Sequence, residues 1–338
     1  MSTSFRDPVV LGTFLGVLSA VAYAAAATSL RAVIDCDPVF VSFVKAVPTC
    51  GLMGVALLFY RRKSPIPWKF IVTLIVAATL MHLLGNVLFQ WSLGIIGIAL
   101  TVPLALGTVI LAGTILGRFC LQEQVTSRMT ISMSILMVSI CVLSFSATDA
   151  SEAMAGDIQT RVSGGSSTWT FLAVAGSCFS GFAYAIMGVV MRHGLSGKLN
   201  VAETLFTIST SGVVSLGILS YFKIGLAGIA EISGENLQMM FLAGLLTTIA
   251  FAALAKAMQL TTFIFVNALN ASQVAMCSIA GVFFFDESAS LMMWSGVMMT
   301  MIGLLLMRPP QLEQMSDDKL VTSTQESGLS LANEVGHD

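Results

Sequence analysis

The sequence predicts an all-α integral membrane protein with ten transmembrane helices in two five-helix halves. Of its 338 residues, 56% are hydrophobic and only 10% are charged, whereas a soluble domain carries about 25% charged residues. The apolar residues also fall in runs long enough for a helix to cross a bilayer, and one set of motifs occurs in each half. A net charge of −2 excludes a nucleic-acid binder with a basic face.

Ten apolar segments are candidate spans. Two of the breaks between them, 93–97 and 260–261, are short and uncharged. Merging either neighbouring pair would nevertheless give a helix of about 48 residues, where one crossing needs about 20. Backbone polar groups must be paired in lipid, which makes helices the default spanning element. The expected spans are 9–30, 39–60, 70–92, 98–117, 128–146, 169–191, 201–222, 237–259, 262–284 and 289–307.

The distribution of Lys and Arg predicts how these spans are oriented. With the N-terminus inside, only Arg31, Lys45, Arg161 and Lys223 of the 16 basic residues occupy outer positions. This bias follows the positive-inside rule and predicts cytoplasmic termini in a plasma (inner) membrane. A second interpretation stays open at the N-terminus, where the first apolar run ends near an Ala-x-Ala pattern and could be a cleaved signal peptide.

The two halves share motifs at nearly constant spacing. Ala22-Tyr23-Ala24 followed by Arg31 recurs as Ala183-Tyr184-Ala185 followed by Arg192. The motif Gly117-x-Phe119-x-x-x-Glu123 recurs as Gly281-x-Phe283-x-x-x-Glu287. A repeat of five spans is odd, so the second copy would enter the membrane from the opposite side. Secondary transporters use such inverted repeats to enclose a site at the bilayer midplane.

Five-span units that end in this G-x-F-x-x-x-E motif and a final apolar helix resemble EamA repeats. Two such units make a ten-span member of the drug/metabolite transporter superfamily. Asp37-Pro38 leading to Lys45 is also similar to that family, which more often carries Arg at this position. In the second half Asn200 and Thr207 occupy the matching positions. The resemblance implies transport, but it leaves the substrate open.

The resemblance divides the chain into four parts. Residues 9–146 form the first five-helix repeat, and 147–168 form a polar extracytoplasmic linker. Residues 169–307 form the second repeat, and 308–338 form a disordered cytoplasmic tail.

Polar side chains inside two spans are the main candidates for a binding site, because polar groups in a bilayer usually face the bundle interior or a wet cavity. His82, Asn86 and Gln90 follow one another at four-residue spacing, which places them along one face of an α-helix. Asn267, Asn270 and Gln273 follow at three-residue spacing. Each set either joins helices by hydrogen bonds or lines a cavity for a polar solute.

Three further sequence features carry alternatives. Tyr23 and Tyr184 either line a central path or fill the core. Lys45 either extends outward to the interface or is a fixed cation that attracts a carboxylate or phosphate. Glu123 and Glu287 are expected to cap the helices that follow them.

Small-residue motifs predict close helix contacts. Gly12-x-x-x-Gly16, Gly113-x-x-x-Gly117 and Cys277-x-x-x-Gly281 allow close helix approach. We expect them to pack spans four and nine tightly, within the monomer or across a homodimer.

These features predict a secondary transporter of a small organic metabolite, amino-acid-like and neutral or singly charged, that works by export or exchange with alternating access. No G-x-x-x-x-G-K-[S/T] loop occurs, so we expect no nucleotide hydrolysis. The sequence also has no H-E-x-x-H, no C-x-x-C and no Asp inside a span, so we expect no cofactor, no metal and no enzymatic activity. His82 is the only midplane candidate for a proton carrier. A non-transporting scaffold or sensor, or a membrane-embedded lipid-modifying enzyme, remain alternatives. The expected substrate-binding residues are Tyr23, Lys45, His82, Asn86, Gln90, Tyr184, Asn267, Asn270 and Gln273.

Overall fold

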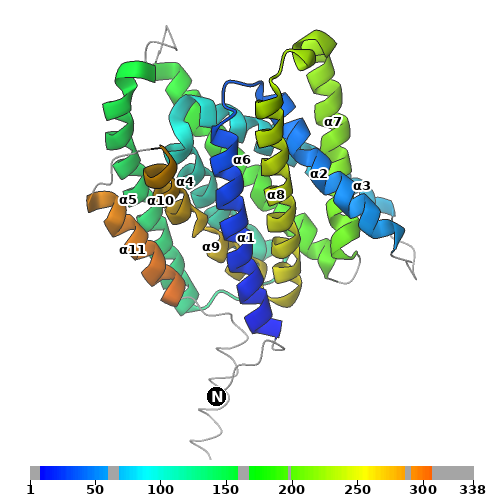
Figure 1. Cartoon of the computed structure of the whole chain (residues 1–338). Coiled ribbons are helices and arrows are strands. Elements are labelled where there is room, and N and C mark those ends of the chain that lie inside the picture. The colour runs from blue at the N-terminus through cyan, green and yellow to red at the C-terminus, as the bar shows by residue number, and fades with distance from the viewer. Residues whose placement is uncertain (1–7, 60–67, 159–166, 197–198, 286–290, 307–338) are drawn as a thin grey trace, which may run out of the picture.

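The computed structural model describes residues 8–59, 68–158, 167–196, 199–285 and 291–306, and all regular structure within them is helical. Figure 1 shows a bundle of long helices that lie side by side. Its elements are α1 (Pro8–Arg31), α2 (Pro38–Leu58), α3 (Trp68–Leu80), the π-helical turn η1 (Met81–Asn86), α4 (Val87–Cys120), α5 (Ser127–Ile158), α6 (Ser167–Leu195), α7 (Val201–Ala230), α8 (Gly234–Leu260), α9 (Phe263–Asn270), α10 (Gln273–Phe285) and α11 (Leu291–Leu306).

The helices have the length and composition of membrane spans. Within the described residues, 8 helical segments are long and apolar enough to cross a bilayer. Two shorter apolar helices, Ser127–Val142 and Trp294–Leu306, occupy the positions of the fifth and tenth expected spans. The predicted class, an all-α integral membrane protein, is therefore confirmed.

Both short breaks predicted between spans are present. Gly97 has a φ of 72° and interrupts α4, a backbone conformation that costs glycine far less than any residue with a Cβ. The second break lies between α8 and α9, where Thr262 caps α9 by accepting a hydrogen bond from the Phe265 backbone N–H. The first break separates the apolar segments Trp68–Ile98 and Thr101–Cys120, and the second separates α8 from α9.

The region between the halves contains more helix than a linker requires. α5 continues through 147–158 and α6 begins at Ser167, so much of the expected polar linker is helical. The expected tail, 308–338, lies outside the described residues, as does Glu287.

Helices of the first half pack mainly on helices of the second. α1 lies against α8, α2 against α7, α4 against α6 and α5 against α11, and the first and last of these pairs can be followed in Figure 1. α1 also contacts α9 and α10, so the segment that could have passed for a signal peptide is an integral helix of this bundle.

The glycine motifs pack α4 and α1 against α9. A Cβ placed on Gly113 would lie 2.8 Å from Asn267 Nδ2, and one on Gly117 would lie 2.8 Å from Ile264 Cγ1. On α1, a Cβ on Gly16 would lie 2.7 Å from Leu269 Cδ1. The prediction of tight packing between spans four and nine is confirmed, and these contacts lie within a single chain.

Candidate solute-binding cavity

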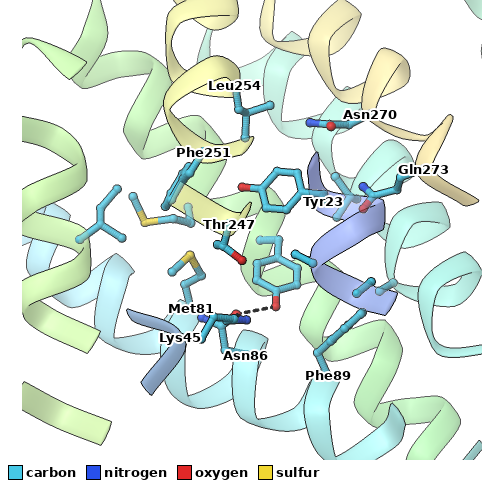
Figure 2. Close-up of a pocket in the computed structure, with 18 of the residues that line it drawn as sticks. Tyr23, Lys45, Met81, Asn86, Phe89, Thr247, Phe251, Leu254, Asn270 and Gln273 are labelled. Carbon is cyan, nitrogen blue, oxygen red and sulfur yellow. Dashed lines mark hydrogen bonds between the residues drawn. The ribbon is translucent and has the colours of Figure 1, made fainter. Parts of the chain in front are cut away.

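A cavity of about 190 Å³ lies at the junction of the two halves. The first half contributes residues from α1, α2, η1 and α4, and the second contributes residues from α6 to α10. Figure 2 shows its side chains converging from these helices. Pockets for drug-sized ligands are about 300–1,000 Å³, so this cavity suits a smaller solute.

One side of the cavity is built around Asn86. Lys45 Nζ donates a hydrogen bond to Asn86 Oδ1 at 2.8 Å, and the Tyr184 hydroxyl donates to the same oxygen at 2.9 Å. Tyr184 comes from α6, so these hydrogen bonds join the two halves. Figure 2 shows Lys45 beside Asn86. Lys45 therefore points into the cavity, and the expectation that it extends outward to the interface is wrong.

His82 is held at both ring nitrogens. Its Nε2 donates to the Ile208 carbonyl of α7 at 3.1 Å, and its Nδ1 accepts from Asn86 Nδ2 at 2.9 Å. The tautomer follows from these partners, because a carbonyl can only accept. His82 is 5% exposed and touches the cavity. These hydrogen bonds link η1 to α7 and orient the Asn86 side chain.

The π-helical turn separates Gln90 from the other two polar residues of span three. His82 and Asn86 lie within η1 and line the cavity, whereas Gln90 is buried but lies outside the cavity lining. A π-turn holds more residues than an α-turn, so the face beyond it is rotated relative to a regular helix. The expected single stripe is therefore broken after Asn86.

An amide cluster, which we define as Asn267, Asn270 and Gln273, lines the cavity from α9 and α10. All three side chains are less than 10% exposed. Asn270 Oδ1 accepts a hydrogen bond from Ser19 Oγ at 3.3 Å, while Asn267 Nδ2 has no partner among the described residues. Figure 2 places Tyr23 beside Asn270 and Gln273, across the cavity from Lys45. Both tyrosines therefore line the cavity.

Sequence reasoning missed the rest of the lining, which is mostly apolar. Met81 and Phe89 come from the first half, and Thr247, Phe251 and Leu254 come from α8. The sequence offers no signal that separates these residues from ordinary core side chains, because α8 is apolar along most of its length.

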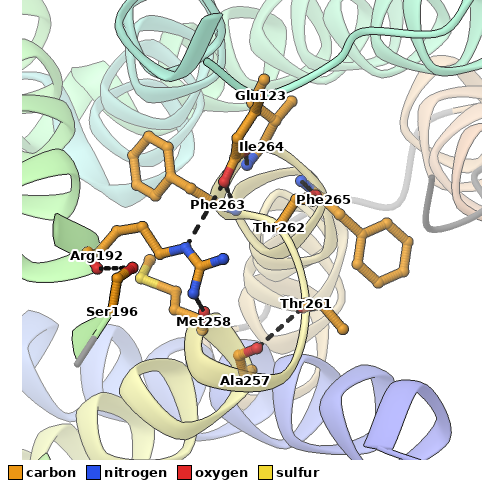
Figure 3. A network of polar contacts seen from close by, with 10 residues as sticks. All are labelled: Glu123, Arg192, Ser196, Ala257, Met258, Thr261, Thr262, Phe263, Ile264 and Phe265. Carbon is orange, nitrogen blue, oxygen red and sulfur yellow. Dashed lines mark hydrogen bonds and ion pairs between the residues drawn. The ribbon is translucent and has the colours of Figure 1, made fainter. Parts of the chain in front are cut away.

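Glu123 joins the two halves at the start of α9 (Figure 3). Its carboxylate accepts from the backbone N–H groups of Phe263 at 2.7 Å and Ile264 at 3.0 Å. Arg192 Nε lies 3.7 Å from Glu123 Oε1, and the same guanidinium donates to the Met258 carbonyl. Glu123 thus caps α9, and the expectation that it caps the following helix is wrong. A negative charge at the start of any helix is stabilised by the helix dipole, and tertiary packing decides which helix that is.

A second ion pair across the halves lies at the turn between α1 and α2. Asp37 Oδ1 caps α2 by accepting from the Val39 and Phe40 N–H groups, and Asp37 Oδ2 lies 2.6 Å from Lys223 Nζ of α7. The sequence indicates the Asp37-Pro38 motif, but it does not indicate that Lys223 is the partner of Asp37.

The fold and the cavity together define a polytopic α-helical membrane protein with an internal site between two halves. Residues 169–308 match the model of the EamA-like transporter family. The second half of the chain is therefore similar to that family, which lies in the drug/metabolite transporter superfamily.

One solved structure, described as "Crystal structure of protein", shares the fold over most of the chain. Its TM-score is 0.66 at 12% sequence identity, and the match covers 87% of this chain and 97% of that chain. No curated protein gives a significant match.

Proposed function

We propose that this protein is a secondary transporter of a small organic metabolite, neutral or singly charged, that works by export or exchange. The observation that carries this proposal is the cavity between the halves, which combines a mostly apolar lining with a few convergent polar groups, as binding sites for small molecules do. Tyr23, Lys45, Asn86, Tyr184 and the amide cluster would contact the solute, with His82 holding Asn86 in place.

The packing of the halves supports alternating access. α2 and α7 occupy corresponding positions of the two halves and pack on each other, as do α5 and α11. Such pairing is expected where two oppositely inserted repeats are related by an axis through the site. Both ends of the chain would then be cytoplasmic, in a plasma (inner) membrane. Rocking of one half against the other would open the cavity to each side in turn.

The alternatives fit these observations less well. A scaffold has no need for a cavity with a cationic side chain inside it, and flux separates a carrier from a sensor that only binds its solute. A lipid-modifying enzyme needs a nucleophile, an acid–base pair or a metal set at the membrane interface. The convergent polar groups of the described residues lie instead at the junction of the halves, where a carrier requires them.

Flux through purified protein in proteoliposomes tests the proposal. Counterflow would be measured with a monocarboxylate, an amino acid and a neutral solute, each against empty liposomes. Thr247→Trp would fill the cavity and should reduce flux at least tenfold. Ile249 lies two residues further along α8 on the outside of the bundle, where its side chain is 51% exposed. Ile249→Trp should therefore leave flux unchanged. Flux of no solute class above the empty liposomes would contradict the proposal.

A further inference from the structure

We infer that the solute is a monocarboxylate with an apolar body and no amino group beside the carboxylate. This inference rests on the proposed transport function and names the substrate class of the same cavity. Its basis is the donor and acceptor inventory around Lys45, the only Lys, Arg, Asp or Glu side chain among the described residues that line the cavity.

The Lys45 ammonium has unused hydrogen-bonding capacity. An ammonium has three N–H donors, and the hydrogen bond to Asn86 Oδ1 uses one of them. No carboxylate pairs with Lys45 among the described residues, and the cavity lining there contains no Asp or Glu. A cation removed from water without a counter-charge is unfavourable, so an anion bound in the cavity would complete this site.

The amide oxygen of Asn86 and the ring nitrogen of His82, which lie beside Lys45, are already occupied as acceptors. Asn86 Oδ1 accepts from both Lys45 and Tyr184, which fills its two lone pairs, and His82 Nδ1 accepts from Asn86 Nδ2. A second ammonium here would meet a like charge and find no free acceptor on these groups. An α-amino acid carries its ammonium only two bonds from the carboxylate carbon, so its binding through Lys45 would create this conflict.

The single positive charge of Lys45 and the apolar surface around it determine the charge and the body of the expected solute. A dianion such as a phosphate monoester or a dicarboxylate would leave one negative charge without a cation. Phe89, Phe251, Leu254 and Met81 face the same space (Figure 2), which suits an apolar body. The cavity volume of about 190 Å³ is below the roughly 300–1,000 Å³ of pockets for drug-sized ligands, so we expect a small body, such as one aromatic ring with a short chain.

Matched probes separate these possibilities. Binding to purified protein at pH 7.5 would be measured by thermal shift, and transport by counterflow, with 3-phenylpropanoate. The comparison probes are 3-phenylpropanamide, which is neutral, phenylalanine, which adds the ammonium, and phenylsuccinate, which adds a second carboxylate. We expect 3-phenylpropanoate to bind at least tenfold more tightly than each of the three.

Variants at Lys45 assign the effect to one side chain. Lys45→Met should weaken binding of 3-phenylpropanoate at least tenfold and leave the weak binding of the amide unchanged, while Lys45→Arg should retain the preference for the acid. Lys256→Met is the matched control, because Lys256 is exposed and its Nζ bonds Gln259. If Lys45→Met does not fold, the acid–amide comparison on the unaltered protein decides.

Equal binding of the acid and the amide, or a Lys45→Met variant that keeps full affinity for the acid, would overturn this inference. Preferential flux of phenylalanine or of the amide would overturn it too, yet would leave the transport function standing. An absence of binding and flux for every probe would overturn both.

Discussion

At the scale of single residues, the contact between His82 and Gly212 is a tight steric constraint beside the cavity. His82 is buried and bonded at both ring nitrogens, so its ring has little freedom to move. Gly212 of α7 leaves the space that the ring occupies, and a Cβ placed there would overlap His82 Nε2. The absence of a side chain at Gly212 therefore allows η1 and α7 to approach.

Gly212→Ala is expected to lower the free energy of unfolding by about 2 kcal/mol, the usual cost of overpacking. Gly51→Ala is the control, since no atom lies within 4 Å of a Cβ at that position on α2, and alanine is the better helix former. A denaturant titration in detergent measures both. A Gly212→Ala variant as stable as Gly51→Ala would show that the His82 ring can move aside.

At the scale of helices, most element positions were predictable because a bilayer fixes the length of an apolar span. Glycine at position 97 also marked a break that the structure confirms. The π-helical turn was not predictable, because one extra residue in a turn leaves the hydropathy of the span unchanged. This turn is the reason that Gln90 lies outside the cavity lining. The partner of Glu123 was not predictable either, because Phe263 lies 140 residues away.

The candidate site was also predictable only in part. Polar residues inside spans identified Asn86, Asn267 and Asn270 as candidates before their neighbours were known. The apolar lining from α8, which includes Phe251, required the structure, because a side chain that faces a cavity and one that faces a neighbouring helix look alike in a sequence.

Glu123→Gln is expected to loosen the start of α9. The variant keeps one acceptor oxygen but loses the charge that serves two backbone N–H groups and Arg192. The loss should be about 1 kcal/mol, as for other helix caps. Hydrogen exchange at the Phe263 and Ile264 amides should become faster than in the unaltered protein.

Glu235→Gln is the control for this exchange measurement. Glu235 is an exposed acidic residue in the first turn of α8, so the substitution removes one charge without touching α9. Unchanged exchange at Phe263 and Ile264 in Glu123→Gln would contradict the role of this carboxylate as the cap of α9.

At the scale of the whole molecule, contacts between the halves both hold the fold and enclose the cavity. Three contacts join residues from the two halves: the hydrogen bond from Tyr184 to Asn86, the capping of α9 by Glu123, and the ion pair of Asp37 with Lys223. In the proposed alternating access, one half would move against the other by exchanging some of these contacts while others persist. A carrier needs this property, since its site has to open to one side while it is closed to the other.

The accessibility of a cysteine in the cavity from each side of the membrane tests this most directly. Both variants are made on a background in which the six native cysteines are replaced. Thr247→Cys places a thiol in the cavity. Ile249→Cys places one on the same helix, but on the outside of the bundle. A membrane-impermeant thiol reagent applied in turn to each side should label Thr247→Cys from both sides and Ile249→Cys from neither. Labelling of Thr247→Cys from only one side, or from neither, would contradict a carrier that works by alternating access.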